Sequence, residues 1–420
     1  MTAVKKTLRF LLLGLLALVV TAAVAIALIV KLVLAPSTGE WATPLRAGPL
    51  PVDIGIPTAI RLTTSPWVAP RLEGLSFDTR FGTVRLGWDE PGQSLELHCA
   101  PCSATVAALG DQPIRMARLM ATVRRDGNVL AGRIDASPDG SGSAPLAGRW
   151  NGRLSQKALQ LDVEMDPAPI AGWYVALAPA LPELRQARIG GTLALRGQAT
   201  LPGGAMTLQP RIAQFSVEGL GTEAMLNARS SCGAPARLAN DSWLARAVIA
   251  AEDQRFFQHP GYDLAELGAA AAANQKAGTV ERGGSTLTQQ LARLLVTGSE
   301  RSGERKLREL LYAVEMEQTL GKARILQLYL DNAPWGDGVC GAEAAARRYF
   351  RRGARALEPA QAVWLAAMLH NPGVELAQWQ RSGVVDPARA KWVAEGIRGI
   401  SRKQRDALLV AVAAARFAPP

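Results

Sequence analysis

The pattern of apolar and polar residues changes twice along the chain. Residues 10–30 carry no charged side chain, and they follow three cations, Lys5, Lys6 and Arg9. A helix needs about 20 apolar residues to cross the hydrocarbon core of a bilayer. We therefore expect a transmembrane anchor within residues 1–36. Its basic end should stay in the cytoplasm, and the rest of the chain should be exported.

A cleaved signal peptide is the alternative to an uncleaved anchor. Small residues at Ala23, Ala25 and Ala27 resemble a cleavage site. The apolar core of a signal peptide is usually about 7 to 15 residues long, however, which is shorter than this segment. The length of the apolar run favours the anchor.

Alternating apolar and polar residues predict β-strands between residues 37 and 230. The Asp126-Gly127 pair is typical of a tight hairpin turn. We expect a β-rich domain of antiparallel hairpins over residues 37–230. It shows no catalytic constellation, and its role could be to space the next domain from the bilayer or to bind a partner. The clearest alternation places apolar side chains at Leu159, Leu161, Val163 and Met165.

Helical signals dominate the second half of the chain. Residues 227–241 are rich in Asn, Ser, Gly and Pro, and Ser242 is a good N-cap for a following helix. We expect a mainly α-helical domain over residues 231–380 and a helical tail over residues 381–420, so the whole chain is an α+β multidomain protein. One helix, which Gly321 should end, has its apolar face at Leu307, Leu310, Leu311 and Val314.

The net charge of +11 suggests an anionic partner. Excess arginine and lysine can bind nucleic acid or the surface of an anionic membrane. The sequence contains no zinc-finger spacing and no RNA-binding signature, so we expect no nucleic-acid partner. An exported chain instead meets lipid head groups and phosphorylated lipids.

The four cysteines leave several interpretations open. Cys99 and Cys102 could form a small disulfide in an oxidising compartment. The Cys-x-x-Cys spacing also resembles a thioredoxin site, but residues 94–98 alternate like a strand, whereas a redox site would lie at a helix start. A metal site that includes His98 is less favoured, because no second ligand pair follows at zinc spacing.

Glu252 is the first candidate for catalysis. It should lie where the helix that starts at Ser242 ends, and Phe256 and Phe257 follow closely. The negative end of a helix dipole and an apolar environment both raise the pKa of a carboxyl group. Such a group can act as a general base towards a sugar hydroxyl. A surface glutamate at a frayed helix end is the alternative.

Two neighbours of Glu252 have simpler expected roles. Asp253 should cap the helix or pair locally. His259 precedes Pro260-Gly261, and we expect it to stabilise the turn by hydrogen bonding rather than to transfer protons.

A glycine-rich segment and a run of cations predict an anion site. Gly283-Gly284-Ser285-Thr286 precedes an expected helix over residues 287–296, and a helix N-terminus can bind phosphate. Ser285 could equally be a simple N-cap. Guanidinium groups match the oxygens of a diphosphate, although a charge run is often only a solvated face. The cations are Arg293, Arg301, Arg305, Lys306 and Arg308.

Glu309 is the second candidate carboxylate. It lies four residues after Arg305 and three after Lys306, so all three should share one helical face. This arrangement could be a surface ion pair. It could also be a second catalytic carboxylate, which the cations keep ionised, whereas the environment of Glu252 raises the pKa of that group.

Together these segments resemble the peptidoglycan glycosyltransferases of family 51, over roughly residues 240–375. The monofunctional, membrane-anchored type is the most similar, because the Ser-x-x-Lys and Lys-Thr-Gly motifs of the bifunctional penicillin-binding type do not occur. The matching series is Glu252-Asp253-x-x-Phe256-x-x-His259-x-Gly261, Gly283-Gly284-Ser285-Thr286-x-Thr288-Gln289-Gln290, Arg305-Lys306-x-x-Glu309 and Ile325-Leu326-x-x-Tyr329-Leu330.

The resemblance implies a lysozyme-like helical head and a smaller jaw at Tyr262–Arg282 that touches the membrane. The implied substrate is lipid II, a disaccharide-pentapeptide on undecaprenyl diphosphate. An inverting displacement would extend the glycan strand in peptidoglycan biosynthesis, which maintains the cell wall and cell shape. The protein would be single-pass in the bacterial inner membrane with a periplasmic catalytic domain. Its partners would be lipid II, the growing strand and other cell-wall synthesis or division proteins, and Mg²⁺ or Mn²⁺ could bridge the diphosphate.

The resemblance also implies roles for individual residues. Glu252 corresponds to the general base that removes the proton from the 4-hydroxyl of the acceptor, and Glu309 to the second catalytic glutamate near the diphosphate. The implied substrate-binding residues are Asp253, Phe256, His259, Gly283, Gly284, Ser285, Thr286, Thr288, Gln289, Gln290, Arg293, Arg301, Arg305 and Lys306.

Four positions depart from the family pattern. Arg293 replaces the usual Lys, Leu294 a common Asn, Asp331 the usual Asn, and His370 a frequent Pro. None removes a required carboxylate, so we expect activity. The alternatives are a non-catalytic scaffold that binds lipid II, and a lysozyme-like hydrolase that also uses two carboxylates.

Overall fold

The computed structural model describes residues 33–47, 50–105, 113–138, 145–204, 206–277, 279, 283–298 and 302–418. The predicted transmembrane segment at residues 10–30 lies outside these ranges. Among the described residues, no helix combines the length and the apolar character that a membrane crossing requires.

The chain divides into two compact units. The first is β-rich and contains the residues up to Ala104, then Arg115–Ala168 and Ala194–Arg211. The second contains Thr105–Ile114, Pro169–Leu193 and Ile212–Pro420. This division differs from the expected boundary at residue 230, because three segments before that boundary belong to the helical unit, namely Thr105–Ile114, Pro169–Leu193 and residues 212–230.

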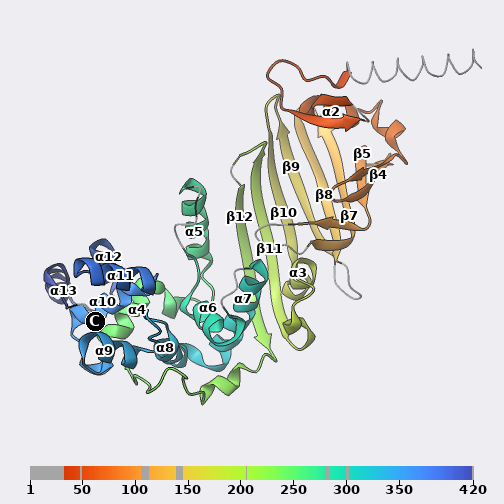
Figure 1. The fold of residues 1–420 in the computed structure, drawn as a ribbon. Helices are drawn as coiled ribbons and strands as arrows, with labels where there is room; N and C mark the ends of the chain where they lie inside the picture. The colour runs from red at the N-terminus through yellow and green to blue at the C-terminus, as the bar shows by residue number, and fades with distance from the viewer. Residues whose placement is uncertain are drawn as a thin grey trace, which may run out of the picture. The chain divides into compact units, whose positions relative to one another are not determined.

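A ten-stranded sheet accounts for most of the strands. Its order is β12-β11-β10-β9-β8-β7-β5-β4-β3, and β6 pairs with β7. The long strands β8, β9 and β10 lie side by side in Figure 1. The strands are β3 (Ser76–Thr79), β4 (Gly82–Asp89), β5 (Ser94–Cys99), β6 (Cys102–Ala104), β7 (Ile114–Asp126), β8 (Val129–Pro138), β9 (Leu146–Leu154), β10 (Leu159–Pro169), β11 (Arg188–Leu201) and β12 (Met206–Glu218).

The local predictions for the β-rich unit are confirmed. In β10, Leu159 is buried and Gln160 is exposed, as the alternation predicts. Strands β7 and β8 form the expected hairpin, in which Asp126 pairs with Val129. Gly127 has a φ of +56°, which a two-residue hairpin turn requires.

Two smaller elements complete the β-rich unit. A separate hairpin of β1 (Ala42–Ala47) and β2 (Leu50–Gly55) precedes α2 (Ile56–Thr63). The Cys99–Cys102 disulfide joins the end of β5 to the start of β6. The disulfide interpretation is therefore confirmed. Within the described ranges, no group of three His, Cys, Asp or Glu side chains could hold a metal ion.

The largest hydrophobic core of the helical unit is formed by side chains from several helices. Leu244 and Val248 of α4 contribute to this core together with Trp364 of α10. Val393 and Ala394, in the segment expected to be a tail, are fully buried in the same core. The helices are α3 (Ile170–Leu177), α4 (Trp243–Glu252), α5 (Leu264–Ala277), α6 (Leu287–Ala292), α7 (Gly303–Thr319), α8 (Gly321–Asn332), α9 (Ala342–Phe350), α10 (Pro359–Met368), α11 (Pro372–Ser382), α12 (Pro387–Gly396) and α13 (Arg402–Ala414).

A second cluster joins α7 to segments from the β-rich half of the sequence. Ile170 and Tyr174 of α3 and Val217 of β12 pack against Leu311 and Val314 of α7. The predicted apolar face of this helix is thus confirmed, and its cover comes from residues more than ninety positions earlier. This arrangement explains why residues 169–193 belong to the helical unit.

Polar contacts strengthen the same attachment to α7. The buried carboxylate of Glu315 accepts hydrogen bonds from the backbone N–H groups of Leu220, at 2.7 Å, and Thr222, at 3.3 Å. Glu183 accepts a hydrogen bond from the Arg308 side chain at 2.7 Å. Residues 183, 220 and 222, which precede α4 in the sequence, are therefore held against α7 by these hydrogen bonds.

The Cys232–Cys340 disulfide and Asp331 anchor the segment before α4. The two cysteines are 108 positions apart. Asp331, at the end of α8, accepts a hydrogen bond from the backbone N–H of Ala236 at 2.9 Å. Burial raises the pKa of this carboxyl group. The unusual aspartate therefore holds this segment against α8.

Candidate active site

Glu252 is the last residue of α4, as expected. The hydroxyl of Ser242 caps the start of this helix and accepts a hydrogen bond from Ala245 N–H. The Glu252 side chain is only 11% exposed. Gln290 donates a hydrogen bond to its Oε2 at 3.1 Å, and an Arg389 guanidinium nitrogen lies 3.5 Å from its Oε1. Glu252 is thus a buried carboxylate with one hydrogen-bond donor and one cation beside it.

Burial raises the pKa of Glu252 above its usual value. The hydrogen bond from Gln290 and the positive charges of Arg389, His370 and Arg293 oppose this rise without cancelling it. Removal of water disfavours the charged form of a carboxyl group, which accounts for the direction of the net shift. A carboxylate of raised pKa is a stronger proton acceptor than a solvated one.

The hydroxyl of Tyr329, on α8, sets the orientation of Gln290. It donates a hydrogen bond to Gln290 Oε1 at 3.0 Å. Because the amide oxygen accepts from Tyr329, the amide nitrogen faces Glu252. Tyr329 belongs to the matching series, but this positioning role could not be inferred from the sequence alone.

A buried network joins the end of α4 to the start of α6. The Nε2 of His259 lies 3.0 Å from both Asp253 carboxylate oxygens, and Gly261 N–H donates to its Nδ1 at 3.2 Å. The proton of neutral His259 therefore lies on Nε2, which donates to Asp253. Thr286 donates to the Gly261 carbonyl at 2.7 Å, and Leu287 N–H donates to Asp253 at 2.9 Å. His259 stabilises the turn, as expected, and Asp253 caps α4 and pairs locally.

The start of α6 differs from the expectation. Thr286, not Ser285, is the N-cap, and its side chain forms a capping box with Gln289. The N–H groups of Leu287 and Gln289 donate to Asp253 and Thr286, so they are not available to a phosphate. The regular α-helix also ends at Ala292, where a π-helical turn, η5 (Arg293–Thr297), begins. The prediction that this helix start offers free N–H groups is therefore wrong at these two positions.

Glu309 and two cations form a compact cluster on α7. Its carboxylate is fully buried, and its oxygens accept hydrogen bonds from Arg305 Nη1 and, at 2.7 Å, from Lys306 Nζ. Lys306 also donates to Ser285 Oγ at 2.6 Å. The predicted shared helical face is confirmed. The cluster brings Ser285, before α6, next to the cations of α7.

Lys306 is the accessible member of this cluster. Its side chain is 44% exposed, compared with 10% for Arg305. Partial burial, together with the charges of Arg305 and Arg293, lowers the pKa of Lys306 to about 8. An anion beside Lys306 would relieve the repulsion among the three cations.

Arg293 connects the two carboxylate environments. Its charge lowers the pKa of Glu252 and also that of Lys306. Electrostatic effects of this kind require short separations at a partly solvated site. Helix α6 brings the two environments together, because Gln290 donates to Glu252 and Ser285, just before the helix, accepts from Lys306.

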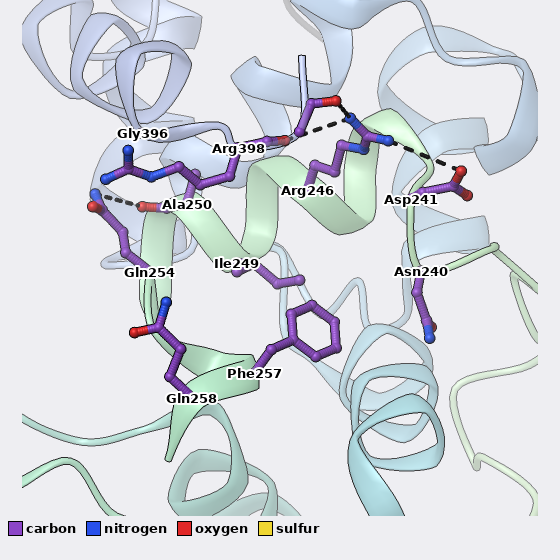
Figure 2. A pocket seen from close by; sticks show the side chains of 11 residues that line it. Asn240, Asp241, Arg246, Ile249, Ala250, Gln254, Phe257, Gln258, Gly396 and Arg398 are labelled. Carbon is purple, nitrogen blue, oxygen red and sulfur yellow. Dashed lines mark hydrogen bonds and ion pairs between the residues drawn. The ribbon is translucent and has the colours of Figure 1, made fainter.

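The two phenylalanines near Glu252 behave differently. Phe256 is fully buried, and the Lys322 ammonium lies 4.4 Å from its ring centre. Phe257 is 56% exposed and borders a cavity of about 370 Å³ that Ile249 and Ala250 of α4 also line (Figure 2). Glu252 does not line this cavity. The prediction that both rings remove water from Glu252 is wrong for Phe257.

The structure sorts the predicted substrate-binding residues into groups. Gly284 lies close to α5, where a Cβ atom would come within 3.2 Å of Leu267 Cα, and Gly283 is exposed. Arg301 lies outside the described residues. The residues gathered around the two carboxylates are Ser285, Gln290, Arg293, Arg305 and Lys306. A second group has buried side chains that pack beneath these residues: Asp253, Phe256, His259, Thr286 and Thr288.

Arg389 is a site residue that the sequence did not indicate. It lies on α12, in the segment expected to be a tail, and donates a hydrogen bond to the Ala251 carbonyl at 2.7 Å. Its guanidinium carbon lies 4.4 Å from the centre of the Trp392 ring. No local motif marks this arginine, because its contact with Glu252 depends on the packing of α12 against α4.

Comparisons with known proteins agree with this geometry. A family model described as Transglycosylase matches residues 237–397. A biosynthetic peptidoglycan transglycosylase of Thiobacillus denitrificans is 47% identical over 136 residues, which make up 32% of this chain and 58% of that protein. Proteins of the same name from Chromobacterium violaceum and Methylobacillus flagellatus are 50% identical over 129 residues and 44% identical over 146 residues.

These matches cover part of each protein. They include 31% and 35% of this chain, and 57% and 64% of the relatives from Chromobacterium violaceum and Methylobacillus flagellatus. The chain thus spans less than two thirds of the length of these relatives. The matched region contains Glu252, Glu309 and Arg389. Residues 237–397 of this chain are therefore similar to the transglycosylase family.

Proposed function

We propose that this protein is a peptidoglycan glycosyltransferase that joins lipid II units into glycan strands. One observation carries the proposal. A buried carboxylate of raised pKa, Glu252, contacts Gln290 of α6, and the cationic cluster around Glu309 contacts Ser285 just before the same helix. Glycosyl transfer from a diphosphate needs a proton acceptor beside the attacking hydroxyl and positive charge beside the departing diphosphate.

Glu252 would act as the general base. It would accept the proton of the acceptor sugar's 4-hydroxyl while that oxygen attacks the anomeric carbon of the donor. The bond between this carbon and the diphosphate oxygen would break, and its electron pair would leave with undecaprenyl diphosphate. Attack opposite the leaving group inverts the configuration. Gln290 and Arg389 hold the Glu252 carboxylate in place during the transfer.

The cluster on α7 would bind the departing diphosphate. Lys306 is exposed, and Ser285 lies beside it. Arg305 and Arg293 add positive charge that would stabilise the negative charge developing on the leaving group. Glu309 would position the cations, since each of its oxygens accepts a hydrogen bond from one of them. It is thus the second essential carboxylate in this proposal.

A metal ion held by the protein does not fit this cluster. Glu309 is the carboxylate present, and both of its oxygens are already paired with Arg305 and Lys306. In the described ranges, no group of three potential metal-ligating side chains occurs. The donor set suits an anion, and a divalent cation that accompanied the diphosphate would depend on substrate oxygens. We therefore assign no step to a metal.

Two features support a proposal about the compartment, namely the apolar run at residues 10–30 and the two disulfides. We propose that residues 10–30 anchor the protein as a single span in the bacterial inner membrane and that both compact units are periplasmic. The Cys99–Cys102 and Cys232–Cys340 disulfides support an oxidising compartment. The β-rich unit would be available to other proteins of cell-wall synthesis or division.

The experiment that tests this function uses the purified full chain and lipid II. We expect glycan polymer from the wild type and none from Glu252→Gln, while both proteins bind lipid II. Glu223→Gln is the matched control, because Glu223 is an exposed carboxylate in the same unit. Binding without polymer in the wild type would favour the scaffold, and release of soluble fragments from peptidoglycan would favour the hydrolase.

A further inference from the structure

A narrow apolar groove lies along one side of α7. Its volume is about 90 Å³, and all of its lining residues belong to the helical unit. Helix α3 and strands β11 and β12 supply most of the walls, and α7 supplies the rest. The lining side chains are Ile170, Trp173, Tyr174, Leu177, Leu193, Ile212, Phe215, Leu307 and Leu310.

The polar atoms of the groove are already paired. The indole nitrogen of Trp173 donates to the Leu193 carbonyl at 3.1 Å, and the Tyr174 hydroxyl donates to the Leu307 carbonyl at 3.1 Å. The remaining lining side chains are hydrocarbon or phenyl groups. A polar ligand would therefore lose its hydration without gaining new hydrogen bonds, whereas a hydrocarbon ligand would gain from burial.

The groove begins next to the proposed diphosphate site. Leu307 follows Lys306 directly, and Leu310 lies four residues after Lys306, on the neighbouring strip of the helix surface. Both leucines are only half buried. The most exposed cation of the cluster and the groove are therefore adjacent on one helix.

We propose that this groove binds the first isoprenoid units of a polyprenyl diphosphate whose diphosphate contacts Lys306. The inference rests on the proposed function and adds a binding site for the lipid part of its substrate. In a polyprenyl diphosphate, the hydrocarbon chain begins at the carbon that is bonded to the diphosphate oxygen. A protein that binds both parts must therefore present cations and an apolar surface next to each other. Helix α7 offers both within one turn.

The size of the groove limits what it holds. A site for a whole drug-sized ligand usually has about 300 to 1,000 Å³. The present volume of about 90 Å³ suits only the beginning of the chain. The remaining isoprenoid units would extend beyond the groove. The wall that α3, β11 and β12 supply comes from the segments of the β-rich half, so these segments would contribute directly to substrate binding.

Binding of two small probes to the full chain tests this inference. In one detergent, we compare geranyl diphosphate with inorganic pyrophosphate. We expect about tenfold tighter binding of geranyl diphosphate to the wild type, because it adds buried hydrocarbon to the same anion. Leu177→Gln should abolish this difference and leave pyrophosphate binding unchanged. Leu208→Gln is the matched control, since Leu208 is exposed on β12 and does not line the groove.

A second measurement needs no variant. A photoreactive benzophenone derivative of geranyl diphosphate should label wild-type protein within residues 169–193, 212–217 or 307–310, which contain the lining side chains. Labelling confined to other segments would overturn the inference. Equal affinities of the wild type for both probes would also overturn it, and the groove would then be a packing gap only.

The two proposals fail in different ways. If pyrophosphate binds equally well to the wild type and to Lys306→Ala, the diphosphate site is wrong, and the groove assignment is overturned with it. If Lys306→Ala weakens pyrophosphate binding but the geranyl group adds no affinity, only the groove assignment is overturned. Polymer formation from lipid II then still supports the proposed function.

Discussion

Lys306 offers a sharp test of the electrostatic site because its pKa lies in an accessible range. The change is Lys306→Arg, which keeps the positive charge but removes the titration, since the guanidinium stays protonated. Partial burial and the charges of Arg305 and Arg293 lower the pKa of Lys306 to about 8. The free protein should therefore lose this positive charge as the pH rises from 7 to 9.

The magnitude follows from the protonated fraction. With a pKa of about 8, roughly 90% of Lys306 is protonated at pH 7 and roughly 10% at pH 9. An ordinary lysine would lose only about 3% of its charge at pH 9. If binding of the diphosphate requires the charged form, kcat/KM for lipid II should fall about ninefold between pH 7 and pH 9 in the wild type.

The assay is polymer formation at substrate concentrations well below KM, across pH 6.5 to 9.5. The ratio kcat/KM is suitable because it reports the ionisation of the free enzyme. Lys306→Arg should show no decline over this range, and its melting temperature should match that of the wild type. The reasoning is refuted if wild-type kcat/KM is constant to pH 9, or if the arginine variant shows the same decline.

Three further predictions concern the base, a disulfide and the attachment of α7. Gln290→Ala removes a hydrogen bond that favours ionised Glu252, so the pKa of Glu252 should rise further. As the pH is lowered, kcat/KM for lipid II should then begin to fall at a higher pH than in the wild type. The same pH dependence in both proteins would contradict this prediction. Replacing Cys232 and Cys340 by serine opens a link between positions 108 apart and should destabilise the helical unit by up to about 4 to 5 kcal/mol. The same change at Cys99 and Cys102, only 3 positions apart, should lower stability by less than half as much in urea titrations. Glu315→Ala leaves the N–H groups of Leu220 and Thr222 unpaired and should reduce the free energy of unfolding by about 2 to 4 kcal/mol, whereas Glu223→Ala should have almost no effect.

The sequence predicted those parts of the fold that depend on local pattern. Strand β10 and the β7–β8 hairpin were predictable because alternation and an Asp-Gly turn act over a few residues. Helix α3 was not, because its sequence is apolar on every side and such a short run fits a strand or a buried helix equally well. Its packing against α7 is a contact between distant segments that no local period reveals.

The site shows the same division between local and distant information. The spacing of Arg305, Lys306 and Glu309 on one helix predicted their contact. The spacing could not show that Asp253 and His259 lie in a buried network, because that depends on how α6 packs against the end of α4. Arg389 was beyond sequence reasoning, since it reaches the carbonyl of a residue 138 positions away.

The Cys232–Cys340 disulfide was not predicted from the sequence. With four cysteines in the sequence, pairing Cys99 with Cys102 leaves these two as the remaining pair. The second link could thus have been deduced by elimination.

The packing of residues 169–230 against α7 determines which fragments of this protein can fold. A fragment that began at residue 231, where the composition changes, would lack the side chains that cover Leu311 and Val314 and the N–H groups that pair with Glu315. The bare apolar strip would favour aggregation, so an inactive fragment of this kind would say nothing about whether the sheet takes part in the chemistry. Exchanges of domains with shorter relatives should instead carry residues 169–230 together with the helices they cover.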